Sequence, residues 1–183
     1  MSWKNSADRY GPVSIALHWS TLAFMVLAYV LIELHDEFKR SQYGRALEDW
    51  HGVMGLTILL LVFARLALRL VQVEPRITPK PAQWEMIGAR LMHSALYLFM
   101  TVMPLLGWGI LSAEGHDILF WGLHIPPLTA KDRAFAKQLS EVHETIGNIG
   151  YLLIGLHAAA ALFHHYYKRD DTLKRMLPRK GGN

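Results

Sequence analysis

The chain has 183 residues, 52% of them hydrophobic and 19% charged, with a formal net charge of +4. It contains no cysteine, which excludes disulfides, cysteine-bound iron–sulfur clusters and covalently attached c-type haem. The mean hydropathy is +0.17, and the apolar residues come in long blocks rather than on alternating faces. The basic residues gather at the edges of these blocks, which favours a membrane over nucleic acid as the partner.

Four blocks are long enough to cross a hydrocarbon core about 30 Å thick, which takes roughly 20 helical residues. They cover residues 13–34, 50–71, 89–111 and 144–167. The second contains GLTILLLVFARLALRLV, which is apolar nearly all round and therefore disfavours a soluble amphipathic bundle. We predict an all-α fold: one integral membrane domain over residues 1–183, built as an antiparallel four-helix bundle.

The distribution of Lys and Arg predicts the orientation of this bundle. Of the 19 basic residues, 13 lie toward the side that holds both termini and 6 toward the other side. The positive-inside rule therefore places both termini in the cytoplasm. Residues 112–142 form an outer loop, in which DRAFAKQLSEV is expected as a short interfacial helix, and the tail 178–183 is expected to be flexible.

Histidines occur in all four apolar blocks or at their edges. In the fourth, His143 and His157 lie fourteen residues apart, which corresponds to about 21 Å of helical rise on one face. His51 opens the second block at the outer side and matches the depth of His143. His18 lies toward the inner side of the first block and matches His157. The antiparallel arrangement thus predicts two histidine pairs stacked across the bilayer.

Two imidazoles that face each other across a helix bundle suit six-coordinate haem iron. Ionisable groups inside a span usually face the bundle interior with a partner. Gly55 and Gly147 each follow a histidine by four residues, so a flat macrocycle has room beside the backbone. Packing histidines and GxxxG helix contacts are the alternatives, but the latter explain only the glycines. Zinc fits less well because it needs three or four convergent ligands.

Three segments carry a family resemblance: LHW in the first block, WHGVMG opening the second, and HETIGNIGYLLIGLHAAAALFHHY with the trailing DTLKRMLPR. They resemble the bacterial four-helix cytochrome b561 family over essentially the whole chain. Its members hold two non-covalent haems b, exchange electrons with ubiquinone, and in some cases oxidise superoxide. The resemblance implies a multi-pass oxidoreductase of the inner membrane that passes electrons from a small periplasmic donor, with superoxide favoured, to ubiquinone. The implied iron ligands are His18, His51, His143 and His157.

Further residues are candidates for contacts with the haems or with quinone. His93 lies near the inner level, where it would hydrogen-bond a haem propionate or replace His18 as a ligand. Arg65 and Arg69 either reach lipid headgroups or neutralise propionates. His164, two turns inward of His157, is predicted to line a quinone pocket, with a plain interfacial histidine as the alternative. No catalytic side chain is predicted.

Two other functions are consistent with parts of this pattern. One is a cytochrome b subunit that relays electrons to quinone from a periplasmic dehydrogenase or hydrogenase, with that enzyme as a protein redox partner. Such subunits often carry an additional helix, which this chain lacks. The other is a non-redox membrane protein, such as a small transporter. Membrane lipid is an expected partner in every case, and nucleic acid is not.

Overall fold

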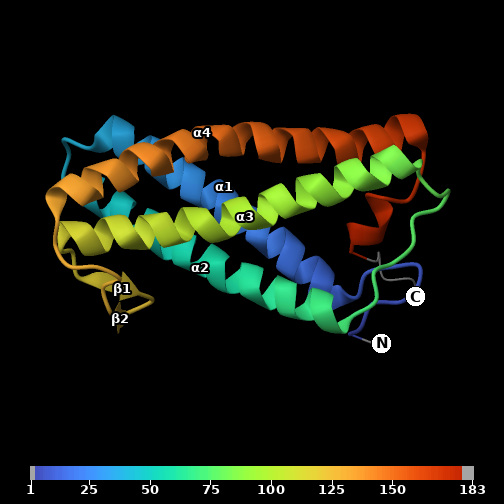
Figure 1. The fold of residues 1–183 in the computed structure, drawn as a ribbon, viewed down its shortest axis with the longest axis horizontal. Helices are drawn as coiled ribbons and strands as arrows, with labels where there is room; N and C mark the ends of the chain where they lie inside the picture. The colour runs from blue at the N-terminus through green and yellow to red at the C-terminus, as the bar shows by residue number, and fades with distance from the viewer. Residues whose placement is uncertain (1–2, 179–183) are drawn as a thin grey trace.

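The computed structural model of the protein describes residues 3–178. Four long helices form an elongated bundle: α1 (Pro12–Phe38), α2 (Gly44–Val71), α3 (Gln83–Glu114) and α4 (Arg133–Phe163). Each is long and apolar enough to cross a membrane. Successive helices run in opposite directions, and the segments before α1 and after α4 lie at the same end (Figure 1). The predicted four spanning helices are therefore confirmed by length and composition.

The helices are longer than the apolar blocks that predicted them. Hydropathy marks the part of a helix that lies in hydrocarbon, whereas the polar turns at either end continue through the headgroup layer. The largest difference is at α4, where the expected short interfacial helix DRAFAKQLSEV is instead the first part of the spanning helix. Asp132 fixes this start, because its side chain accepts hydrogen bonds from the backbone N–H groups of Ala134 and Phe135 at 2.9 and 3.1 Å.

A small β-hairpin departs from the purely helical prediction. Strands β1 (Ile118–Phe120) and β2 (Leu123–Ile125) pair antiparallel within the outer loop. Trp121 and Gly122 form the two-residue turn with φ of 50° and 85°, the conformation that tight hairpin turns require. The hairpin folds back against α2, where Trp121 Nε1 donates to Thr57 Oγ1 at 3.1 Å. Its strands are too short to show an alternating pattern in the sequence.

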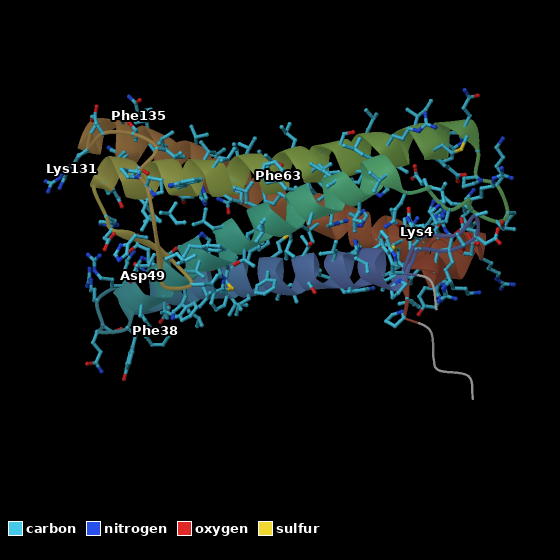
Figure 2. The ribbon with its side chains drawn as sticks, turned by 90° about the horizontal axis from the view of Figure 1, so that it is seen from below. Lys4, Phe38, Asp49, Phe63, Lys131 and Phe135 are labelled. Atoms are coloured by element: carbon cyan, nitrogen blue, oxygen red, sulfur yellow. The ribbon has the colours of Figure 1, made fainter. Side chains whose placement is uncertain are left out.

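The core and the surface of the bundle are both apolar. Val62 is fully buried, and Met54, Ile58, Phe99 and Met100 pack around it. Large apolar side chains also point outward at mid-height, as Phe63 does in Figure 2, where its side chain is 53% exposed. A surface of this kind is stable in lipid rather than in water.

Helix α4 continues into a π-helical turn, η1 (His164–Lys168), followed by a short 3-10 turn, η2 (Lys174–Met176). The η2 segment folds back over the end of the bundle, where Trp19 Nε1 donates to the Met176 carbonyl at 2.7 Å. The buried Arg175 side chain donates to the Pro75 carbonyl. The predicted flexible tail, 178–183, falls outside the described residues except for its first position.

Candidate functional site

The structure brings the four predicted histidines together as two pairs. The ring centroids of His51 on α2 and His143 on α4 lie 6.1 Å apart, and those of His18 on α1 and His157 on α4 lie 6.3 Å apart. Two imidazoles that bind one metal ion from opposite sides, each nitrogen about 2 Å from it, have centroids on the order of 6 Å apart. Both pairs therefore have the spacing that a bis-histidine haem iron requires.

Backbone contacts orient the rings of the outer pair. His51 Nδ1 lies 2.8 Å from the Ala28 carbonyl oxygen, which can only accept, so Nδ1 donates. This leaves the lone pair of Nε2 free to coordinate a metal, as in metal-binding histidines generally. His143 Nδ1 is buried and makes no hydrogen bond of normal geometry with the described residues. The backbone of Met103 nevertheless interacts electrostatically with this ring.

The inner pair is accompanied by two further groups that the sequence had singled out. The His93 ring lies 5.6 Å from the His157 ring, so three imidazoles meet at this level. Arg65 Nη2 lies 3.2 Å from His18 Nδ1. Arg65 has no carboxylate partner among the described residues, so the site offers an uncompensated positive charge to an anionic ligand such as a propionate.

The two arginines of α2 behave differently. Arg65 turns inward to His18, whereas the exposed Arg69 lies 3.7 Å from Glu74 at the surface. Both guanidinium groups also lie over the Tyr97 ring, at 5.4 and 5.9 Å from its centroid. The proposed contact with a haem propionate therefore fits Arg65 better than Arg69.

The glycines next to the outer pair also differ in their surroundings. A Cβ on Gly55 would meet nothing within 4 Å, so there is open space beside the backbone one turn from His51. A Cβ on Gly147 would lie 3.5 Å from Met103 Cε, an ordinary contact. Gly55 therefore leaves room for a flat ligand, whereas Met103 occupies the space beside Gly147.

The chain is similar to known proteins over nearly its whole length. The sequence model of the family described as prokaryotic cytochrome b561 matches residues 9–179. The chain belongs to this family. It is 37% identical over 174 residues to cytochrome b561 homolog 1 of Escherichia coli (strain K12), covering 94% of this chain and 99% of that protein. It is 34% identical over 174 residues to probable superoxide oxidase CybB of Yersinia pestis, covering 95% and 98%.

Membership of the cytochrome b561 family fixes the general function. The protein is a bacterial membrane cytochrome that binds b-type haem and takes part in electron transfer. A more distant relative, cytochrome b562 of Cereibacter sphaeroides, is 26% identical over 173 residues. The predicted resemblance to this family is thus confirmed.

Between its two histidine pairs, this cytochrome b561 carries a layer of aromatic side chains that the sequence did not reveal. Gly150 lies seven residues from both His143 and His157, halfway between the two levels. A Cβ on Gly150 would collide with the Tyr29 hydroxyl and the Phe99 ring. Tyr29 also donates to the Gly147 carbonyl at 2.7 Å. Gly150 therefore accommodates side chains of α1 and α3, not a macrocycle.

At the end of α4 that lies beyond the inner pair, His164 is held by a partner that the sequence had not singled out. Its Nδ1 lies 2.5 Å from Asp170 Oδ2, and the two side chains are only 19% and 4% exposed. Burial alone would raise the pKa of Asp170, but hydrogen bonds from His164 and Thr172 outweigh it and lower that pKa below its usual value. A carboxylate on Nδ1 leaves Nε2 as the free nitrogen of His164.

Proposed function

We propose that this cytochrome b561 holds two haems b in one membrane domain and passes electrons across the inner membrane from superoxide in the periplasm to ubiquinone. One haem would bind between His51 and His143 and the other between His18 and His157. The observation that carries this proposal is that one helix, α4, supplies a histidine to each of two pairs with the same spacing, 6.1 and 6.3 Å.

Bound haem iron supplies one-electron chemistry, and the residues of the chain determine where that chemistry takes place. The Ala28 carbonyl accepts a hydrogen bond from Nδ1 of His51, which leaves Nε2 of this ring free to bind the iron. Arg65 places a positive charge beside His18, where an acidic substituent of the macrocycle would be stabilised. The apolar core around Val62 excludes water between the two levels.

The orientation in the membrane is part of the proposal. Lys4 lies at one end of the molecule, and Asp49, Lys131 and Phe135 lie at the opposite end (Figure 2). The excess of basic residues in the sequence is at the Lys4 end, which supports a cytoplasmic location for both termini. The His51–His143 pair then faces the periplasm and the His18–His157 pair the cytoplasm.

For quinone, His164 is the proposed proton donor and acceptor. It lies about 10 Å from His157 by helical rise, at the end of the bundle closer to the inner pair. Asp170 fixes its tautomer by accepting from Nδ1, so Nε2 is the atom at which a proton would be exchanged with a carbonyl or hydroxyl of the quinone ring.

Superoxide as donor is supported by the probable superoxide oxidase among the relatives, which is 34% identical to this chain. The test is to add superoxide to purified oxidised protein in the presence and absence of superoxide dismutase, following the visible absorption of the haem. We expect reduction that the dismutase abolishes and reoxidation on addition of ubiquinone. Reduction by dithionite but not by superoxide would favour a protein donor such as a periplasmic dehydrogenase.

A further inference from the structure

A groove of about 620 Å³ lies at the start of α3. The start of α3 is at the end of the bundle that holds both terminal segments (Figure 1). Within α3 the lining residues of the groove are spaced as one stripe along the outward face of the first two turns. The loop before the helix closes one side. The lining residues are Lys80, Pro81, Gln83, Met86, Ile87 and Arg90.

The groove carries two positive charges and no negative one. Lys80 and Arg90 are exposed, and neither has an ion-pair partner among the described residues. The one acidic residue of the first turn, Glu85, faces away from the groove. Its buried carboxylate lies 2.6 Å from Lys168 Nζ and accepts from the Ala82 N–H. The groove therefore attracts an anion.

The start of α3 adds to this positive potential. The N-cap residue, Ala82, has no polar side chain to satisfy the free N–H groups of the first turn. These groups and the helix dipole favour an anion near the helix start, and phosphate oxygens are frequent ligands at such positions. The two basic side chains and the start of the helix thus all favour an anion in the groove.

The position of the groove along the helix favours a lipid as the source of this anion. Helix α3 has 32 residues and is about 48 Å long, whereas the hydrocarbon core is about 30 Å thick. About six residues at each end therefore lie at the depth of the headgroups, and a long basic side chain just below them, such as that of Arg90, reaches this layer by snorkelling. Trp84 and Leu91, which flank the groove, are 71% and 67% exposed, as expected for side chains in contact with the membrane interface.

We propose that this groove binds the phosphate of an anionic phospholipid. Lys80 and Arg90 contact the phosphate, while Met86 and Ile87 pack against the glycerol and the first methylenes of the acyl chains. The site is separate from the two histidine pairs, because none of its lining residues belongs to either pair. A soluble phosphate would use the same cations but not the two apolar side chains.

Binding can be measured by native mass spectrometry of the full-length protein in detergent, titrated with dioleoylphosphatidylglycerol or dioleoylphosphatidylcholine. We expect the wild type to bind the anionic lipid at least about tenfold more tightly than the zwitterionic one. The variant Lys80→Gln/Arg90→Gln should bind the anionic lipid roughly 30-fold more weakly than the wild type. A control with the same loss of charge at the same end is Arg76→Gln/Lys174→Gln, since both side chains are exposed and lie outside the groove.

Equal affinity for the two lipids would overturn the proposal, and so would an equal loss of affinity in the control variant. Soluble glycerol 3-phosphate distinguishes the two sources of phosphate. If it does not displace the lipid at millimolar concentration, the lipid assignment stands. If it binds as tightly as the lipid and depends on Lys80 and Arg90 to the same extent, the groove is a site for a soluble anion instead.

Discussion

The imidazole ring of His157 on α4 lies 6.3 Å from that of His18 on α1, although the backbones of these two helices approach each other at few points. Helix α1 packs mainly on α2, and α4 mainly on α3. The histidine pair therefore spans two helices that do not pack tightly on each other, which is where a flat ligand can enter without displacing a tightly packed interface.

The first prediction is that each histidine pair can be lost without the other. His51→Ala or His143→Ala should remove the outer haem, and His18→Ala or His157→Ala the inner one, because the two levels are about 21 Å apart by helical rise. The reduced-minus-oxidised spectrum and the haem content of each purified variant measure this. If His51→Ala and His157→Ala abolished the same spectral component, the assignment of ligands to levels would be wrong.

The two histidine pairs could be predicted from the sequence alone. The interval between His143 and His157, combined with antiparallel spans, was sufficient to place four side chains on three helices. It was sufficient because helical rise converts a sequence interval into depth. Membrane spans are also predicted well, since every backbone polar group in lipid must be satisfied within a helix or a closed barrel.

The sequence could not reveal contacts that depend on packing between distant segments. Nothing in the local pattern indicates that Tyr29 and Phe99 meet over Gly150, because the three residues lie on three different helices. Asp170 was overlooked for a similar reason: it follows the apolar block and reaches His164 only because the backbone turns through Arg169, at φ 56°. The start of α4 was misplaced because its first turns are polar, although Asp132 is a recognisable N-cap.

The second prediction concerns the aromatic layer. Gly150→Ala should lower the stability of the protein by about 1–3 kcal/mol, because the new Cβ overlaps Tyr29 and Phe99 in a packed interior. Gly155→Ala is the matched control on the same helix, since its Cβ would meet nothing within 4 Å. There the change should be neutral or stabilising by up to about 1 kcal/mol, from helix propensity. Thermal unfolding in detergent, followed by circular dichroism, compares the two variants.

The third prediction tests His164. His164→Ala should leave both haems bound and reducible but slow their reoxidation by ubiquinone at least about tenfold, because a positioned proton donor typically contributes 100-fold or more. The neighbouring His165→Ala is the control and should reoxidise like the wild type. Stopped-flow absorption of the prereduced proteins gives both rates. Wild-type reoxidation in His164→Ala would move the quinone site away from this histidine.

The fourth prediction follows from the lowered pKa of Asp170. A carboxylate whose pKa is lower in the folded protein contributes stability above its unfolded pKa, about 3.9, and loses it as the pH falls through the folded value. The segment after α4 should therefore detach below about pH 4, and limited proteolysis at residues 169–177 should report it. Asp170→Asn should remove this acid dependence; if it persisted unchanged in that variant, another group would be responsible.

The haem content of the purified wild-type protein tests the central claim most directly. The pyridine haemochrome spectrum, divided by the protein concentration from amino-acid analysis, gives the number of haems b in each chain. Two pairs with the same spacing predict two haems per chain, both extractable with acidified acetone, because the chain has no cysteine to attach them. A value of one haem per chain, or of no haem, would contradict the account.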